Sequence, residues 1–431
     1  MAENIAAQSA VSSRGLGLST KMPAFFHVLE DQWDPTSNPQ GIVNIGLAEN
    51  ALMQEEMKGF LNSHLNVESH ALTYGDGFSG SKRLRESLCH FLNRHFQPHV
   101  PLSPSHMVAT AGASNALECC AWALCDPGDY ILIGRPYWTT FRTLLGNRAS
   151  VNVLDVNFDG VDPFSSDAVE LYRETYMQAI KKGKKITAIL LCSPNNPLGR
   201  CYSPEILCSY MRLCGELDIH LVSDELYALS VWENPTMEDP DQFKSVLSFP
   251  SESLMNPQKL HVIWGMSKDF GATGLRIGCL ISQFNTRFLN ACESISLFSF
   301  PSSLADNAVA KLLADDYFTD HFISLNRARL SENYRHVTTT LSDHGIPYTQ
   351  SNAALFVWVN LGAMTKGHGA TDADILEILN REKVYVTSGL TYASEQPGWF
   401  RIVIAHPKHV LDEGLKRIFG AMLYYETRIT K

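Results

Sequence analysis

Polar side chains follow three successive apolar runs in the middle of this chain. The segment SPNNPLG contributes Asn196, HLVSDELY contributes Asp224 and Tyr227, and HVIWGMSKDFGATGLRIG contributes Lys268 and Arg276. If the runs are neighbouring parallel strands, these side chains meet at the carboxyl edge of the sheet, where the ligands of such sheets bind. A lysine amine held there can act as a nucleophile or as a base. The spacing therefore predicts one site that combines an amide, a carboxylate, a phenol, an amine and a guanidinium.

Each of these features also has an ordinary structural explanation. The NP dipeptide is typical of a turn. Asp224 follows an apolar strand and suits the cap of the next helix. A lysine in the position of Lys268 is commonly a loop residue. The occurrence of all three at successive strand ends favours a site.

The elements that must position these side chains form an alternating pattern. Leu84, Leu88, Phe91 and Leu92 have the spacing of an amphipathic helix. Short apolar runs, rich in β-branched residues, occur at Met107 to Ala111, Tyr130 to Gly134, Val151 to Val156, Ile186 to Cys192, Ile219 to Ser223, His261 to Gly265 and Leu275 to Ser282. Helical stretches lie between several of them, so the pattern predicts an α/β domain with a mostly parallel, seven-stranded sheet covered on both faces.

The pattern changes at about residue 301. A long helix is expected over Ser302 to Leu313, followed by separate strand-like runs at Ala354 to Leu361 and Phe400 to Ile404. We expect a large domain over residues 61–300 and a smaller α+β domain over 301–431, joined by the N-terminal segment 1–60. A chain of 431 residues fits such a division.

Composition excludes several classes of function. With 45% hydrophobic and 19% charged residues the chain can bury a large core, and its net charge of −10 argues against partners that are nucleic acids or anionic membranes. No stretch approaches the roughly 20 apolar residues of a membrane span. The ten cysteines show no CxxC pair, which indicates a reducing, cytoplasmic location.

Two other patterns suggest ligands and are weaker. Gly75, Gly77 and Gly80 match GxGxxG, but no strand precedes them, and the dinucleotide motif has meaning only after a strand. Four histidines occur between His90 and His106. Prolines break the helix that would align them, and no cysteine or carboxylate stands at ligand spacing, so we predict no metal site.

The segments SPNNPLG, SDELY and SKDFGATGLRIG, in this order and spacing, resemble the fold-type I enzymes of the class I aminotransferase family, which use pyridoxal 5'-phosphate (PLP). The resemblance runs from about Asn44 to Ile404. Within the family the chain resembles 1-aminocyclopropane-1-carboxylate (ACC) synthases and their fungal-type relatives. The stretches IGLAENALM, LTYGDG, TAGASNALE, DPGDYILIGRPYW and MSKDFG carry this likeness.

The resemblance implies roles for individual residues around PLP. Lys268 matches the lysine that binds the cofactor covalently, Asp224 the carboxylate beside the pyridine nitrogen, and Tyr227 and Asn196 the groups at the ring's O3'. A nearby carboxylate keeps that nitrogen protonated, so that PLP can accept electrons. Once a substrate amine displaces Lys268, the freed lysine amine is the expected base for the α-proton.

Further matches surround the phosphate, the ring and the substrate. Arg276 matches a phosphate ligand, and Ala113, Ser114 and Asn115 form the turn into a helix whose N–H groups hold the phosphate. Trp138 matches the aromatic residue stacked on the ring. Tyr74 matches the tyrosine that reaches the cofactor of the neighbouring subunit, which implies a homodimer with shared active sites. Arg401 matches the bidentate clamp for the carboxylate of the amino acid substrate.

Departures from the family concern one phosphate donor and the surroundings of the substrate. Gly265 stands where the family usually has a serine that binds the phosphate, and Ser267 is a possible replacement. The family's SSQTQ stretch reads SSLAD from Ser302 to Asp306, and Arg142 stands where ACC synthases usually have an aspartate. These differences do not change the expected cofactor, PLP. They leave the identity of the substrate undecided.

The fate of the substrate after loss of the α-proton is the open question. Glu49, in LAEN, matches a glutamate near the sulfonium substrate S-adenosylmethionine (SAM) in ACC synthases, although a carboxylate at a helix start is an ordinary alternative. Formation of ACC from SAM, β-elimination of a cysteine-type C–S bond, and transamination to a 2-oxo acid all remain possible. We expect a lyase acting on a sulfur substituent, with an aminotransferase as the alternative. A PLP-binding regulator without catalysis is disfavoured by the intact residue set.

Overall fold

The computed structural model describes residues 10–19, 26–365 and 371–429. Its largest sheet has seven strands in the order β2-β8-β7-β6-β5-β3-β4. Their bounds are β2 Met107–Thr110, β3 Tyr130–Gly134, β4 Asn152–Val156, β5 Ile186–Cys192, β6 His220–Asp224, β7 Leu260–Gly265 and β8 Gly278–Ile281. Strand β8 runs antiparallel to both its neighbours, and the other neighbouring pairs are parallel. The predicted α/β class with a mostly parallel sheet is confirmed.

Helices cover both faces of this sheet because its buried strands are apolar on both sides. One face packs against α5 (Lys82–Phe96), α8 (Ser166–Lys181), α9 (Pro204–Leu217) and α12 (Ser303–Leu313). The other face packs against α6 (Ala113–Leu124), α7 (Thr140–Gly146) and α11 (Thr286–Ser296). Neighbouring residues of one strand, such as Leu221 and Val222, belong to opposite faces. This alternation follows from the two-residue repeat of a strand.

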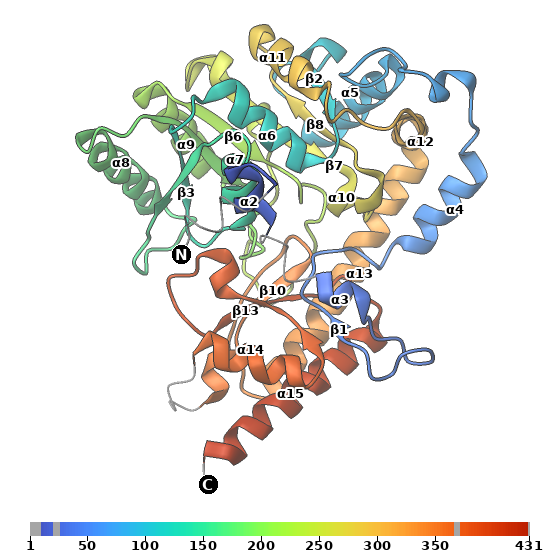
Figure 1. Ribbon diagram of the computed structural model, residues 1–431, viewed down its shortest axis with the longest axis vertical. Helices are drawn as coiled ribbons and strands as arrows, with labels where there is room; N and C mark the ends of the chain where they lie inside the picture. The colour runs from blue at the N-terminus through green and yellow to red at the C-terminus, as the bar shows by residue number, and fades with distance from the viewer. Residues whose placement is uncertain (1–9, 20–25, 366–370, 430–431) are drawn as a thin grey trace.

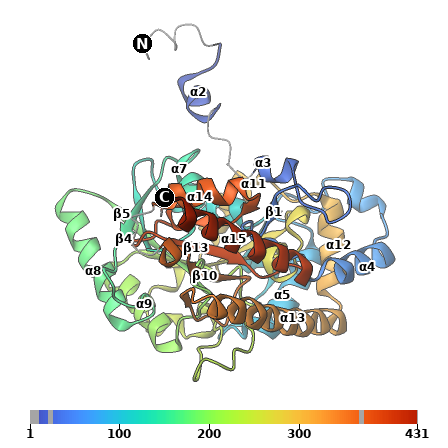
Figure 2. The same ribbon diagram turned by 90° about the horizontal axis from the view of Figure 1, so that it is seen from below.

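A second, four-stranded sheet lies below the larger one, in the lower half of Figure 1. It has the order β12-β13-β10-β9, with β12 Thr387–Ser388, β13 Trp399–Val403, β10 Phe356–Asn360 and β9 Tyr348–Thr349. Helices α14 (Asp372–Arg381) and α15 (Lys408–Ile429) cover the side of this sheet that faces away from the larger sheet (Figures 1 and 2). The long helix α13 (Asp316–Asp343) contributes to both hydrophobic cores.

The N-terminal part joins this second core. Strand β1 (Val43–Asn44) pairs with β11 (Val384–Tyr385), and Val43 and Ile45 are buried in the same core as β10 and β13. The remaining helices are α2 (Ser13–Ser19), α3 (Phe26–Glu30), α4 (Gln54–His64) and α10 (Met266–Asp269). The domain boundaries at residues 60 and 300 stay a prediction. None of the described helices is long and apolar enough to cross a membrane.

A buried histidine pair predicts a pH-dependent loss of stability. His220 Nδ1 lies 3.0 Å from His261 Nε2 across β6 and β7. Burial lowers the pKa of His220 to about 4 and that of His261 well below its usual value. Both rings are neutral in the folded protein, whereas the unfolded chain binds protons below its pKa of about 6.5. The folded state should therefore lose roughly 3 kcal/mol for His220 as the pH falls from about 6.5 to about 4.

The measurement is the free energy of unfolding in urea at pH 7 and pH 5. The free energy of unfolding should fall between pH 7 and pH 5 by about 2 kcal/mol less in His220→Asn than in the wild type. His90→Asn, which changes an exposed histidine on α5, is the matched control. An unchanged pH difference in His220→Asn would contradict the interpretation.

Candidate active site

A cavity of about 320 Å³ lies at the carboxyl edge of the seven-stranded sheet, where strands β5, β6 and β7 end. It is lined by Leu47, Ala48, Ala113, Ser114, Leu117, Trp138, Phe141, Cys192, Asn196, Asp224, Leu226, Tyr227, Ser267, Lys268, Thr273, Arg276 and Arg401. The cavity thus brings together ten residues that the sequence singled out for the site or as a replacement donor: Ala113, Ser114, Trp138, Asn196, Asp224, Tyr227, Ser267, Lys268, Arg276 and Arg401.

Lys268 lies in α10, directly after β7, and its amine points back to the N-terminal segment. Its Nζ donates a hydrogen bond of 2.5 Å to the carbonyl oxygen of Ala48. Burial, and secondarily the positive charge of Arg401, lower the pKa of the amine to about 8, while Glu49 acts in the opposite direction. A lysine with this pKa is partly neutral at neutral pH, and the neutral amine is the form that acts as a nucleophile or base.

Asp224 ends β6 and is a buried carboxylate without a hydrogen-bonded cation among the described residues. It is 5% exposed, and among the described residues its carboxylate accepts a hydrogen bond only from the Leu226 N–H, at 3.3 Å. Burial raises the pKa of Asp224 to about 7, against smaller effects of that N–H and of Lys268. A protonated pyridine nitrogen would supply the missing positive partner, so this position fits PLP.

Tyr227 and Asn196 offer donors to the same space. The Tyr227 hydroxyl makes no hydrogen bond with any described residue, and burial raises the pKa of this phenol. Asn196 follows β5, and its Oδ1 accepts a 2.9 Å hydrogen bond from Arg401. Because the carbonyl end of this amide is occupied, its NH₂ group is the end left to face a ligand oxygen.

Arg401 approaches the cavity from the second sheet, on β13. Its Nη1 and Nη2 donate to Asn196 Oδ1 and, at 2.8 Å, to the carbonyl of Gly46. The buried Nε has no partner, and the guanidinium pairs with no carboxylate within the described part of the chain. The guanidinium carbon lies 4.6 Å and 5.0 Å from the ring centroids of Phe356 and Tyr392. A buried cation held by neutral groups is suited to bind an anionic ligand.

The segment from Gly46 to Ala51 connects these groups. Its carbonyl oxygens at Gly46 and Ala48 accept hydrogen bonds from Arg401 and Lys268. Two further bonds tie it down: Asn50 Nδ2 donates to Asn326 Oδ1 at 2.8 Å, and the Ala51 N–H donates to the carbonyl of Ala405. The N-terminal segment therefore forms one wall of the cavity through its backbone.

The end of the cavity beside the N-terminus of α6 is built by close backbone approach. At the N-terminus of α6, the N–H groups of Ala113 and Ser114 have no acceptor among the described residues. A Cβ on Gly278 would lie 2.6 Å from the backbone carbon of Gly112, and one on Gly112 (φ +80°) would lie 2.3 Å from Arg276 Nη2. These two glycines let the Arg276 guanidinium lie against the turn that precedes α6, where its Nη2 donates to the Ala111 carbonyl at 3.1 Å. A guanidinium and free helix N–H groups at the same turn suit an anion.

Gly265 has a related explanation. A Cβ there would lie 3.0 Å from the carbonyl oxygen of Ile277 and 3.1 Å from Gly278 Cα. A serine at this position would therefore press on strand β8. The Ser267 hydroxyl, which lines the cavity nearby, is the candidate to replace the hydroxyl donor that Gly265 lacks, whereas the Thr273 hydroxyl donates to the Ser267 carbonyl at 3.0 Å.

Four residues from the sequence analysis lie outside the cavity lining. Asn115 turns away, since its Nδ2 donates to Ser299 Oγ at 2.8 Å. Glu49 is half-buried beside the cavity wall and acts on Lys268 through its charge. Tyr74 is 79% exposed and borders a different cavity. Arg142, expected near the substrate, instead pairs with Asp155 at 2.6 Å on the outside of the sheet.

The sequence missed residues that act through shape or backbone. Leu47, Ala48, Leu117, Phe141, Cys192, Leu226 and Thr273 also line the cavity. Phe141 packs edge-on against Trp138, with 5.4 Å between ring centroids. Apolar side chains and main-chain carbonyls carry no chemical signal in a sequence. The hydroxyl of Thr273 could have been recognised, because Thr273 lies between Lys268 and Arg276 in the same motif.

The GxGxxG glycines and the group of four histidines do not form ligand sites within the described residues. Gly75, Gly77 and Gly80 follow a short 3₁₀ helix, Ser69–Leu72, and no strand. His90 lies 2.9 Å from Asp316 and His106 Nδ1 accepts from the Ser103 N–H. Across residues 10–19, 26–365 and 371–429, no group of three or more His, Cys, Asp or Glu could hold a metal.

Comparisons with known proteins find a family model and relatives that match most of the chain. The model of the aminotransferase class I and II family matches residues 44–418. A probable aminotransferase of Leptosphaeria maculans, sirI, is 31% identical and covers 92% of this chain and 94% of its own. The mouse ACC synthase-like protein 1 is 34% identical and covers 90% of this chain and 77% of its own. ACC synthase 4 of rice is 31% identical and covers 90% of this chain and 84% of its own.

Solved structures share the fold. A double mutant of Thermus thermophilus aspartate aminotransferase superposes with a TM-score of 0.75 at 22% identity, covering 96% of this chain and all of that one. The match of the family model over most of the chain, and the relatives above 30% identity, establish the family and its cofactor, PLP. The chain is a member of the class I and II aminotransferase family, a PLP-dependent enzyme of the lyase or aminotransferase type.

Proposed function

We propose that this enzyme binds an amino acid through its carboxylate, removes the α-proton, and eliminates a sulfur leaving group from the side chain. PLP, when bound, supplies the electron-accepting ring that stabilises negative charge at the α-carbon. Arg401 binds the carboxylate and Lys268 takes the α-proton on Nζ. Glu49 favours a substrate with a cationic sulfur, such as SAM, and a cysteine conjugate is the neutral alternative.

The roles of the cofactor-binding residues belong to the same proposal. With PLP bound, Asp224 would hold the ring nitrogen protonated, Tyr227 and Asn196 would donate to O3', and Trp138 would stack on the ring. Arg276 and the helix turn of Ala113, Ser114 and Asn115 would hold the phosphate, with Asn115 supporting the turn through its bond to Ser299. The free donors and the unpaired carboxylate described above are the groups that PLP requires.

The observation that carries the lyase proposal is the place of Glu49. It follows Ala48, whose carbonyl holds the Lys268 amine, and its charge acts on that amine. Its carboxylate accepts no hydrogen bond from the described residues, so its charge is available to a ligand. Because this carboxylate is half-buried, its attraction for a sulfonium is stronger than that between two fully solvated charges.

Product analysis by mass spectrometry tests the proposal. The purified enzyme is incubated with SAM, with an S-alkyl cysteine, and with a common amino acid plus 2-oxoglutarate. We expect ACC from the first mixture, or a 2-oxo acid, ammonia and a thiol from the second. Glu49→Gln should lower kcat/KM for SAM by about tenfold, and Glu55→Gln, on the exposed side of α4, is the matched control.

The second candidate is an aminotransferase. The name of the Leptosphaeria maculans relative supports it, and that relative is similar over nearly its whole length. Stoichiometric formation of glutamate in the third mixture, with SAM and the cysteine conjugate unchanged, would sink the lyase proposal and support this candidate.

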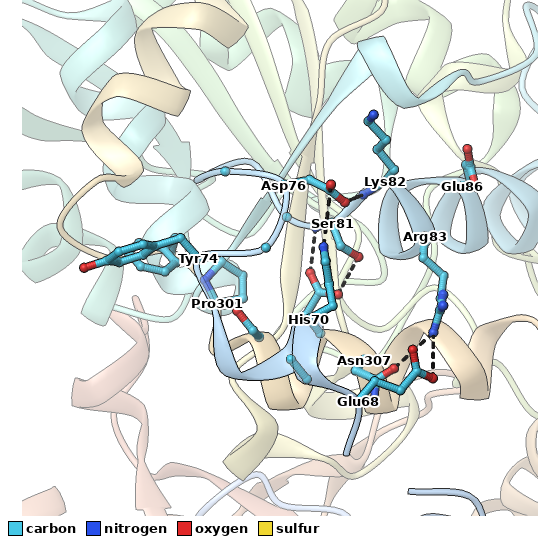
Figure 3. Close-up of a pocket in the computed structure, with 17 residues that line it drawn as sticks. Glu68, His70, Tyr74, Asp76, Ser81, Lys82, Arg83, Glu86, Pro301 and Asn307 are labelled. Atoms are coloured by element: carbon cyan, nitrogen blue, oxygen red, sulfur yellow. Dashed lines mark hydrogen bonds and ion pairs between the residues drawn. The ribbon is translucent and has the colours of Figure 1, made fainter. Parts of the chain in front are cut away.

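We further propose that the enzyme is a homodimer in which Tyr74 reaches the site of the partner. Figure 3 shows Tyr74 pointing away from the other labelled side chains of its cavity. Large apolar side chains are exposed on the same and nearby segments: Leu72, Tyr74, Leu297, Phe298 and Leu304. The Tyr74 ring lies 6.5 Å from that of Phe300. An exposed apolar surface of this kind is typical of an interface between subunits.

A mixing experiment tests the shared site. Tyr74→Ala and Lys268→Ala chains, each of low activity, are denatured together and refolded. If Tyr74 acts in trans, hybrid dimers contain one site with both native residues, and activity should return to about a quarter of the wild-type value, since half of the dimers are hybrid and each has one native site. A mixture that stays as inactive as its components, or an active monomer in sedimentation, would refute the shared site.

We also propose a cytoplasmic location. All ten cysteines are free, and most of them are buried. Free cysteines in this number suit a reducing compartment.

A further inference from the structure

We infer that a second cavity, separate from the PLP site, binds a small aromatic carboxylate. This cavity, called here the Trp399 cavity, has a volume of about 260 Å³ and shares no lining residue with the PLP cavity. It lies between loops of the seven-stranded sheet and strands of the four-stranded sheet. Its defining residues are Arg135, Phe158, Phe164, Arg200, Trp358 and Trp399.

The walls of the Trp399 cavity suit a flat ring. The indoles of Trp358 and Trp399 are stacked, with centroids 6.0 Å apart and planes 10° apart. Phe158, Phe164 and Leu198 form the other apolar surfaces. An apolar cavity of about 150 Å³ is enough for benzene, so this volume accommodates one ring with a short polar group. Offset stacking on an exposed indole face stabilises such a ring.

The two arginines of the Trp399 cavity keep N–H groups that make no hydrogen bond with a described residue. Arg200 reaches Asp162 only through Nη1, at 3.2 Å and 3.3 Å, so its Nε and Nη2 have no hydrogen-bond partner among the described residues. Its guanidinium carbon lies 4.2 Å from the centroid of Phe164. Arg135 donates to the neutral oxygens of Asn157, Ala393 and Ser394 and pairs with no carboxylate in the described part of the chain.

The two carboxylates of the lining are already occupied. Glu395 accepts the N–H groups of Phe158 and Asp159 at 2.6 Å and 2.9 Å. Asp162 accepts from Arg200 and, at 3.2 Å, from the Phe164 N–H. The N–H groups still free to donate therefore belong to the two arginines. A ligand that binds them must supply acceptor oxygens. A carboxylate is the acceptor that guanidinium groups bind best, through two parallel hydrogen bonds.

Both arginines are held in place without the ligand. Arg135 is tied to the carbonyls of Ala393 and Ser394, and Arg200 is fixed by Asp162 and by its stacking on Phe164. A site whose donors are already oriented loses little entropy on binding. Because residues of both sheets line the cavity, its ligand should also stabilise their contact, which raises the melting temperature by mass action.

Benzoate is the probe, titrated by calorimetry into the PLP-loaded Arg401→Gln enzyme, where the substrate carboxylate site is disabled. We expect saturable binding at one site per chain, about tenfold weaker binding of the uncharged analogue benzamide, and a higher melting temperature with benzoate. In the same background, Trp399→Leu and Arg200→Gln should each weaken benzoate binding by about tenfold or more. The matched controls are Trp122→Leu, an exposed indole on α6, and Arg148→Gln, in a surface ion pair with Glu118.

Two results would overturn the inference. One is the absence of saturable benzoate binding to the Arg401→Gln holoenzyme. The other is equal benzoate affinity in Trp399→Leu, Arg200→Gln and the two controls. Trp399→Phe keeps an aromatic wall and guards against misfolding of the leucine variant. Its affinity for benzoate should be within about threefold of that of the Arg401→Gln enzyme. A folded Trp399→Phe variant with much weaker binding would count against the stacking role.

Discussion

Replacing Lys268 with alanine is expected to abolish covalent attachment of PLP and to lower turnover by about 10⁴-fold or more, because one amine serves as anchor and base. The wild-type enzyme, reduced with borohydride, should carry the cofactor on the peptide that contains Lys268. The buried position of this amine and its lowered pKa of about 8 make it the reactive lysine of the cavity. Mass spectrometry of the digested protein reads out the label.

The control and the pH dependence sharpen this test. Lys244→Ala, at an exposed lysine that does not line the cavity, should keep both label and activity. The rate at which the apoenzyme takes up PLP should rise with pH up to about 8 and then level off, since only the neutral amine reacts. Persistence of the label on another lysine in Lys268→Ala would show that the assignment is wrong.

Replacing Asp224 with asparagine is expected to leave PLP bound while turnover falls by about 10²- to 10⁴-fold. The carboxylate has no hydrogen-bonded cation in the described structure, and under the proposed role its charge would keep the pyridine nitrogen of bound PLP protonated. An amide of the same shape keeps the packing and loses the charge. Absorbance of the bound cofactor measures occupancy, and steady-state kinetics measure turnover.

Stability measurements separate this loss from misfolding. Burial raises the pKa of Asp224 to about 7, so the ionised group destabilises the empty site at neutral pH. The apo form of Asp224→Asn should therefore unfold at an equal or higher urea concentration than the wild-type apo form. Asp218→Asn, which changes an exposed carboxylate, is the control. Near-normal turnover in Asp224→Asn would exclude the role of this carboxylate in electron acceptance.

The fold was predictable because its elements repeat locally. All seven apolar runs proposed as strands are strands of the large sheet, and the helix expected from Ser302 is α12, beginning at Ser303. Short β-branched runs between amphipathic helices contain this information within windows of a few residues. The polar residues at the ends of β5, β6 and β7 were detectable for the same reason, since Asp224 ends its strand, Asn196 lies in the turn after β5 and Lys268 lies in the short helix α10 after β7.

Residues that meet across the fold required the tertiary structure. Arg401 lies 205 residues from Asn196 in the chain, and Lys268 lies 220 residues from the Ala48 carbonyl that accepts its hydrogen bond. The family resemblance named Arg401, but no periodicity places β13 beside β5. Likewise, Arg142 follows Phe141 in sequence, yet Phe141 lines the cavity while Arg142 pairs with Asp155 outside it.

The sequence by itself determined the types of group at the strand ends and, through its motifs, the cofactor they serve. Only the tertiary structure decided which carboxylates and guanidinium groups lack partners, and therefore which can bind a ligand. Asp224 and Arg401 differ from the paired charges of the surface by burial and by the neutral groups around them. Burial and pairing depend on distances between segments that are far apart in the chain, and local spacing contains no such distances.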